Sequence, residues 1–230
     1  MAHIWDDMLT ETDKIVIEKG NYGQPRGLGK KPALIIIDLQ PNYVGDDVPI
    51  EEQLDKWPSG GGNIAWECVR NIISLRDAAR EAGVPIFYTK NEQKRSMAFD
   101  IFANKTKRDQ SKYMEGAWEA DLLECLKPLP NEMVISKNYP SAFYGTPLQS
   151  YLIKLGIDTL IVTGGSTCGC CRTTAIEAVT RAYNLAFVQD CVYDRVTLSH
   201  KATLFDIWMK YGDIPTSAEV KEYFKTLKKE

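Results

Sequence analysis

The sequence predicts an α/β fold: a single domain of three layers, α/β/α, with a mainly parallel sheet in the middle. Stretches typical of strands alternate with stretches typical of helices along most of the chain, and this alternation favours parallel strands joined by helical crossovers. Residues 33–37 read ALIII, an apolar run without polar alternation that is typical of a strand buried on both faces. The 230 residues, of which 44% are hydrophobic, are sufficient for one core of this kind.

Strands and helices can be placed in chain order. The predicted strands are residues 33–38, 84–89, 133–136, 158–163 and 185–189. The predicted helices are residues 63–82, 148–155, 170–182, 199–210 and 218–227. Residues 1–31 are polar and rich in turn formers, so we expect an N-terminal extension followed by the domain itself at residues 32–230. Residues 90–127 are expected to form a long loop with a short helix. The connection at 39–62 is longer than ordinary α/β loops, which makes it a candidate for function.

Charge and composition narrow the function classes. The net charge is -3 and the chain has no long basic run, which disfavours nucleic acids and membrane surfaces as partners. No apolar run approaches the roughly 20 residues that span a bilayer. Residues 1–7 are acidic and lack the order of a signal peptide, so a cytoplasmic location is expected. In that compartment the six cysteines are expected to be free thiols.

The most informative stretch is residues 160–178, which read LIVTGGSTCGCCRTTAIEA. The pattern indicates a buried strand, a sharp glycine turn and a helix whose first turn carries a cysteine. A helix N-terminus has unpaired N–H groups and partial positive charge, and both stabilise a thiolate and an oxyanion beside it. The stretch therefore predicts an enzyme with a cysteine nucleophile.

Two further polar residues follow predicted strands. Asp38 comes directly after the run ALIII, and Lys137 comes directly after residues 133–136. Because ligands bind at the carboxyl edge of open parallel sheets, we expect both side chains to lie near the cysteine turn. The structural alternatives are that Asp38 caps a turn and that Lys137 is a solvated surface residue.

The clustered cysteines allow other readings. Cys168, Cys170 and Cys171 lie far in sequence from both histidines, His3 and His200, so a four-ligand zinc site is disfavoured and no metal is expected. Adjacent helical residues point about 100° apart, so at most one of Cys170 and Cys171 faces a given pocket. His200 is the one plausible partner for a Cys–His dyad, but an Asp base with a Lys fits better.

An alternative from another class is a flavodoxin-like redox or binding module in which Cys168 and Cys170 form a reversible pair. Such a module would not require Asp38 and Lys137 at strand ends.

From about residue 20 to its C-terminus, the chain resembles the isochorismatase-like cysteine hydrolases, most closely the N-carbamoylsarcosine amidase branch. The matching motifs, in order, are KPALIIIDL (31–39), VPIFYT (84–89), VISKNYPSAF (134–143), DTLIVTG (158–164), STCGCCR (166–172) and DRV (194–196). The resemblance implies the family's Rossmann-like α/β/α fold, no cofactor and a homo-oligomer, often a tetramer. The chain departs from the family pattern at Cys168 and Cys171, where a small and an apolar residue are usual.

The resemblance also implies a mechanism. The family's catalytic triad carries over onto Asp38, Lys137 and Cys170, and its non-proline cis peptide falls at Gly165–Ser166. The backbone N–H groups of Ser166 and Cys170 would then form the oxyanion hole. The implied reaction is cleavage of a C–N bond in a small amide or N-carbamoyl (ureido) compound through a thioester, with release of ammonia.

The substrate is less constrained by the sequence. In the N-carbamoylsarcosine amidase branch the arginine of the DRV motif binds a substrate carboxylate, which here implies Arg195; the alternative is a structural ion pair with Asp194 or Asp190. Biuret, maleamate and ureidoacrylate hydrolases share the triad and remain alternatives. Nicotinamidases use a metal held by Asp and His, and no His follows Asp38 within a hundred residues. True isochorismatases lack the nucleophilic cysteine. A non-catalytic interaction protein of the same family is disfavoured by the intact triad.

Aromatic side chains are candidates to line the substrate pocket, although each could equally belong to the core. They are Tyr43, Phe99, Phe143 and Tyr144.

Overall fold

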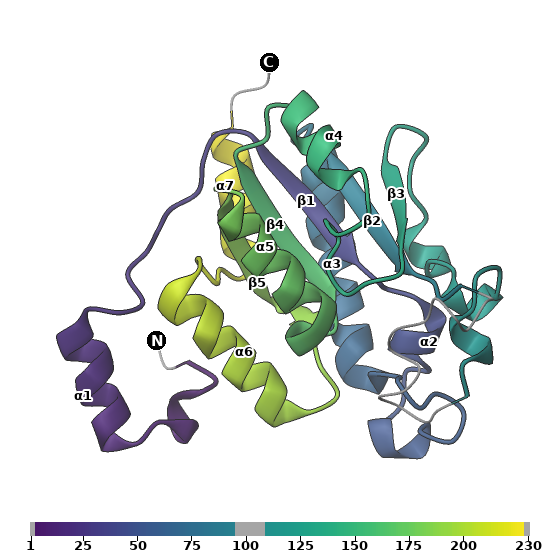
Figure 1. The fold of residues 1–230 in the computed structure, drawn as a ribbon, viewed down its shortest axis with the longest axis horizontal. Coiled ribbons are helices and arrows are strands. Elements are labelled where there is room, and N and C mark those ends of the chain that lie inside the picture. The colour runs from purple at the N-terminus through teal and green to yellow at the C-terminus, as the bar shows by residue number, and fades with distance from the viewer. Residues whose placement is uncertain (1–2, 95–108, 228–230) are drawn as a thin grey trace.

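Five parallel strands form one sheet in the computed structural model, which describes residues 3–94 and 109–227 (Figure 1). The strands are β1 (Pro32–Ile37), β2 (Ile86–Asn91), β3 (Met133–Lys137), β4 (Thr159–Gly165) and β5 (Asn184–Tyr193). Their order in the sheet is β3-β2-β1-β4-β5, and every neighbouring pair is parallel. The chain order reverses between β1 and β4, and in open α/β sheets such a point is where ligands bind.

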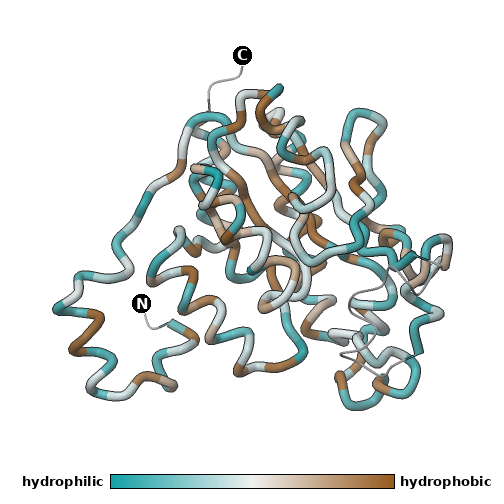
Figure 2. The backbone as a smooth tube through the Cα atoms, viewed as in Figure 1, coloured by the Kyte–Doolittle hydropathy of each residue, from teal (hydrophilic) through white to brown (hydrophobic). Residues whose placement is uncertain are grey.

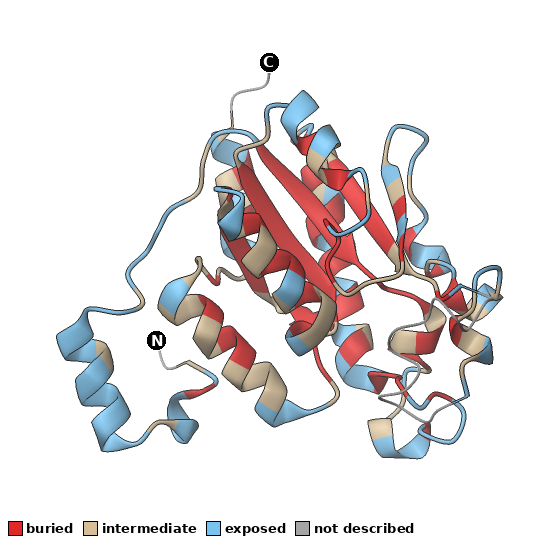
Figure 3. Cartoon of the chain, viewed as in Figure 1, coloured by how far each residue is buried: buried red, intermediate tan, exposed pale blue. Residues whose placement is uncertain are grey.

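Helices cover both faces of the sheet, which confirms the predicted α/β/α fold. On one face lie α3 (Gly62–Glu81) and α7 (Ser217–Thr226). On the other lie α4 (Leu148–Lys154), α5 (Arg172–Thr180) and α6 (Thr197–Lys210). Figure 3 shows the central strands β1 and β4 as buried along their length, whereas the edge strand β3 is partly exposed.

The central position of β1 in the sheet explains why its apolar run contains no alternating polar residues. Ile35 and Ile37 pack into the core on the α4–α5–α6 side, whereas Leu34 and Ile36 pack into the core on the α3–α7 side. Both faces of a central strand are removed from water, so every position is hydrophobic. Figure 2 shows hydrophobic residues, in brown, along the strands of the sheet.

Most predicted elements are confirmed within two residues at each end, and the largest difference is in β5. This strand continues to Tyr193, four residues beyond the predicted end, although Gln189 and Asp190 interrupt its apolar pattern. It pairs with β4 across a register shift between Val162 and Gly164. Such pairing depends on a second strand, so the apolar pattern of β5 alone does not predict it.

The two long connections contain short helical turns. In 39–62 these are α2 (Pro41–Val44) and η2 (Ile50–Glu52); in the described part of 90–127 they are η4 (Ser111–Tyr113), η5 (Trp118–Ala120) and η6 (Glu124–Leu126).

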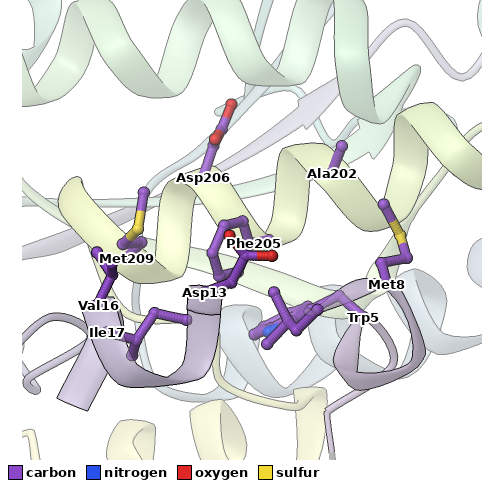
Figure 4. A pocket seen from close by; sticks show the side chains of 10 residues that line it. Trp5, Met8, Asp13, Val16, Ile17, Ala202, Phe205, Asp206 and Met209 are labelled. Atoms are coloured by element: carbon purple, nitrogen blue, oxygen red, sulfur yellow. The ribbon is translucent and has the colours of Figure 1, made fainter. Parts of the chain in front are cut away.

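The N-terminal segment contains η1 (Asp6–Met8) and α1 (Glu11–Gly20) and lies beside α6 (Figure 1). Trp5 is buried against Phe205 and Trp208 of α6, whereas α1 buries none of its residues. A hollow of about 350 Å³ lies between this segment and α6 (Figure 4). None of the helices in the described ranges is long and apolar enough to cross a membrane.

Strands β1 and β4 approach closely at their carboxyl ends, where Ile37 pairs with Gly164. Gly164 has a φ of 108°, and a Cβ at this position would overlap the backbone carbonyl oxygen of Ile37. A glycine is therefore required here for the strands to meet.

We expect Gly164→Ala to lower the free energy of unfolding by about 3 kcal/mol or more, because it adds a backbone clash to an unfavourable φ. The matched control is Gly83→Ala, where φ is 71° but, apart from the glycine itself and its two chain neighbours, no atom lies within 4 Å of the added carbon. The control should cost only about 1 kcal/mol. Urea unfolding measures both, and equal losses would contradict the explanation.

Candidate active site

Three side chains that are far apart in the sequence meet at the carboxyl edge of the sheet. Asp38 follows β1, Lys137 is the last residue of β3, and Cys170 lies in the turn after β4. The Lys137 Nζ atom is 2.7 Å from Asp38 Oδ2 and 3.4 Å from Cys170 Sγ. The structure therefore brings together the three residues of the predicted triad.

Lys137 reaches Asp38 across the end of an intervening strand. Strand β2 lies between β3 and β1, so the two side chains together bridge about two strand spacings, roughly 10 Å. The ammonium group also donates to the Tyr139 carbonyl at 3.2 Å. The side chains of Lys137 and Asp38 are 0% and 1% exposed, and a buried ion pair of this kind is tolerated only when both charges are well hydrogen-bonded.

Asp38 is held by backbone and side-chain contacts with Thr89 of β2. Its φ of 50° lies in the left-handed region, and its N–H lies 3.2 Å from both the carbonyl oxygen and the hydroxyl oxygen of Thr89. The Thr89 hydroxyl in turn donates to Asp38 Oδ1 at 2.5 Å. Thr89 is not among the predicted site residues, because a threonine inside an apolar strand looks like any other β-branched strand residue.

The turn after β4 differs from the expected helix start. Residues Thr167–Cys171 form a wide π-type turn, within which Gly169 has a non-helical conformation, and α5 begins only at Arg172. The predicted helix start at Cys170 therefore lies two residues before the observed start of α5. Cys170 lies in the turn before α5, next to the N-cap residue Cys171, instead of occupying the first turn of the helix.

The Gly165–Ser166 peptide bond is cis, at the position that the family resemblance implies. The Ser166 carbonyl accepts hydrogen bonds from the N–H groups of Gly169 and Cys171. Within the described residues, the N–H of Ser166 itself has no hydrogen-bond partner. One of the two predicted oxyanion donors is thus available at the turn.

The three clustered cysteines have different surroundings. Cys171 is fully buried, with its Sγ 3.9 Å from the Thr163 carbonyl, and Cys168 is exposed. Cys170 is partly exposed, and of the three it is the one whose sulfur contacts the Lys137 ammonium group. Geometry therefore distinguishes Cys170 from its neighbours.

Burial raises the pKa of the Cys170 thiol to about 12; the charge of Lys137 lowers this pKa and that of Asp38 raises it. At neutral pH the group is therefore a thiol, and a nucleophile forms only if a base takes its proton. For Lys137, burial alone would lower the pKa, but the interaction with the Asp38 carboxylate, together with that with the Cys170 sulfur, outweighs it and the pKa is raised. Lys137 therefore remains an ammonium group.

Arg195 makes no ion pair with either predicted acidic partner. Its guanidinium donates to the Ser59 carbonyl at 2.8 Å. Asp194 accepts from the backbone N–H groups of Cys168 and Arg195, and Asp190 accepts from Ser217. The structural ion pair considered as the alternative for Arg195 is thus not observed in the described part of the chain.

The aromatic residues that were candidates to line the substrate pocket lie in different parts of the structure. Tyr43 lies in α2, at the same edge of the sheet as Asp38, and its hydroxyl accepts from Asn91 at 3.1 Å. Tyr144 is 60% exposed and packs edge-on against Tyr139. Phe99 lies outside the described residues.

Phe143 belongs to the core, which is the alternative that the sequence left open. It is buried in the core, stacks on Tyr183 and lies beneath the guanidinium of Arg181. Both partners follow the carboxyl end of α5, whereas Cys170 precedes its amino end.

His200 contacts the cysteine turn but not a sulfur. Its Nδ1 is 2.9 Å from the Thr167 hydroxyl, and burial lowers its pKa, with a smaller opposing effect of Asp194. A Cys–His dyad is therefore not formed. Among residues 3–94 and 109–227, no group of three or more His, Cys, Asp and Glu side chains is arranged to hold a metal ion.

Comparison with known proteins places the chain in a family. A model of the isochorismatase domain matches residues 32–219, so the chain belongs to this family. It is 33% identical to a maleamate amidohydrolase of Pseudomonas putida. That alignment of 210 residues covers 91% of this chain and 94% of the amidohydrolase. It is also 29% identical to an N-carbamoylsarcosine amidase of an Arthrobacter species. That alignment of 235 residues covers 99% of this chain and 83% of the amidase.

A solved structure supports the same fold. The crystal structure of a cysteine hydrolase from Pseudomonas syringae superposes with a TM-score of 0.76 at 22% identity, covering 85% of this chain and 93% of that one.

We expect Lys137→Met to lower the free energy of unfolding at pH 7 by about 3–5 kcal/mol, because it leaves the Asp38 carboxylate buried without its cation. The double variant with Asp38→Asn should recover about 1–3 kcal/mol of this loss, since the amide carries no charge. Chemical denaturation measures the free energy of unfolding of the wild type, of the two single variants and of the double variant. If the losses of the two single variants simply added, the buried pair would not be the source of the effect.

Proposed function

We propose that this protein is a cysteine amidohydrolase that cleaves the C–N bond of a small amide or N-carbamoyl compound through a thioester and releases ammonia. The observation that carries the proposal is the contact of the Lys137 ammonium group with both Asp38 and Cys170 at the carboxyl edge of the sheet. Two relatives named as amidohydrolase and amidase support the reaction class.

In the proposed first step Asp38 takes the proton of Cys170. The thiol is neutral at rest because burial raises its pKa to about 12, so the proton must leave as the substrate binds. Lys137 keeps its positive charge and stabilises the new thiolate, which it already contacts at 3.4 Å.

The thiolate then attacks the carbonyl carbon, and a C–S bond forms as the carbonyl electrons move to oxygen. The N–H groups of Ser166 and Cys170 stabilise this oxyanion, a contribution of about 3–4 kcal/mol per donor. When the oxyanion collapses, the C–N bond breaks and the leaving nitrogen takes the proton from Asp38, so that ammonia departs.

Water completes the cycle. Asp38, now a carboxylate again, removes a proton from a water molecule that attacks the thioester. The C–S bond breaks, the acid is released, and the proton on Asp38 returns to the sulfur of Cys170. No cofactor is needed for these steps.

For the substrate, we propose a small compound that carries a carboxylate as well as the amide or ureido group. Both relatives' names denote such compounds, maleamate and N-carbamoylsarcosine. Arg195 is the proposed carboxylate partner, because its guanidinium is paired with a neutral carbonyl instead of an acidic side chain. Biuret has no carboxylate, so a biuret hydrolase would leave Arg195 without this role.

We expect Cys170→Ala to reduce ammonia release at least about a thousandfold, because the nucleophile is lost. Cys168→Ala and Cys171→Ala should keep kcat within about threefold, since neither sulfur contacts Lys137. Ammonia release from maleamate, N-carbamoyl amino acids, ureidoacrylate and biuret measures the activity. Mass spectrometry that found the acyl adduct on Cys171 would refute the assignment.

We expect Arg195→Ala to raise KM for a carboxylate-bearing amide by about 10- to 100-fold with a smaller change in kcat, because a charge-assisted hydrogen bond to the substrate is lost. Arg70→Ala is the matched control: this arginine pairs with Asp47 on the surface. An unchanged KM in the Arg195 variant would show that the carboxylate binds elsewhere.

A further inference from the structure

Thr89 is a fully buried residue of β2 that contacts the carboxylate of Asp38. Its hydroxyl lies 2.5 Å from Asp38 Oδ1, while Asp38 Oδ2 receives the Lys137 ammonium group at 2.7 Å. The two oxygens of the carboxylate are thus held from two different strands, β2 and β3.

The direction of this hydrogen bond follows from its surroundings. A hydroxyl has one proton and can also accept, and the Thr89 oxygen lies 3.2 Å from the Asp38 N–H, which can only donate. The Thr89 proton is therefore directed at the carboxylate oxygen. A hydrogen bond donated to an anion favours the charged form of that group.

We propose that Thr89 is a positioning residue for the reaction proposed above: it fixes the rotation of the Asp38 carboxylate and stabilises this carboxylate as an anion. Thr89 acts through Asp38 and does not touch the substrate. Without its hydroxyl, the carboxylate would be held by Lys137 alone and could turn its second oxygen away from the orientation that receives the Cys170 proton.

Among the residues that the structure describes, the other charged or titratable groups that interact electrostatically with Asp38 are Lys137, Cys170, Cys171 and Tyr193. Lys137 is positively charged at neutral pH and below, and burial raises the pKa values of Cys171 and Tyr193 well above their usual range. These four groups therefore keep their charge states between neutral and acidic pH and do not account for an acidic limb in the pH profile.

A purely structural role is the alternative, because any buried hydroxyl needs a hydrogen-bond partner. The sheet offers a matched control in Thr163 of β4, on the other side of β1. Thr163 is also fully buried, but its hydroxyl donates to the backbone carbonyl of Ile35 at 2.9 Å. Thr89→Val and Thr163→Val thus remove the same group from equally buried positions, and only the first removes a contact with Asp38.

The experiment measures kcat, KM and their pH dependence for wild type, Thr89→Val, Thr89→Ser and Thr163→Val. For Thr89→Val we expect the acidic limb to move to higher pH by about one unit, because the anion loses a hydrogen bond. We also expect kcat to fall about tenfold with KM changed less than about twofold. Thr89→Ser should restore both, and Thr163→Val should lose stability without a shift of the limb.

A second readout needs no turnover: the rate at which iodoacetamide alkylates Cys170, followed by mass spectrometry across pH. The acidic limb of this rate should shift in the same direction in Thr89→Val. If wild type hydrolyses no amide but the alkylation limb shifts, the proposed function fails and the role of Thr89 stands.

Profiles of Thr89→Val that match those of Thr163→Val in both assays would overturn the role of Thr89. If Thr89→Val does not fold, Thr89→Ala and Thr89→Ser differ by one hydroxyl and decide the same question.

Discussion

The candidate site depends on one interaction, the buried ion pair between Lys137 and Asp38. Taking two charges out of water is costly, and the pair is tolerated because each charge has further hydrogen-bond partners, the Tyr139 carbonyl for Lys137 and the Thr89 hydroxyl for Asp38. The pair also places a base and a fixed cation beside one sulfur. Those two groups are what a buried thiol needs if it is to become a nucleophile.

The sheet order makes this pairing possible. Strand β2 separates β1 from β3, so the long side chain of Lys137 passes over the end of β2, where Thr89 also contacts Asp38. The turn after β4 completes the arrangement from the other side of β1. It directs Cys171 into the core, leaves Cys168 exposed and presents Cys170 to the ion pair. Three adjacent thiols in one motif thereby acquire three different environments.

Much of the fold could be predicted because its signals are local. The apolar run of β1 and the helical spacing of α3 each lie within a single element. The extension of β5 to Tyr193 and the turn before α5 could not be predicted in the same way. The first depends on pairing with β4, and the second on the conformation of Gly169. The place of Phe143 could not be decided from the sequence either, because an aromatic residue in a motif can pack into the core as readily as it can line a pocket.

By itself the sequence determined the fold class and predicted that Asp38, Lys137 and a cysteine of the glycine turn lie at one edge of the sheet, since strand ends and a glycine turn are readable from residue order; the family resemblance then selected Cys170. Only the tertiary structure decided which cysteine meets the lysine and that Arg195 binds a neutral carbonyl in place of an acidic partner. It alone revealed that Thr89 supports Asp38. The reason is physical: these contacts join residues that lie 33 to 136 positions apart in the chain, and strand order and register, not local pattern, bring them within hydrogen-bond distance.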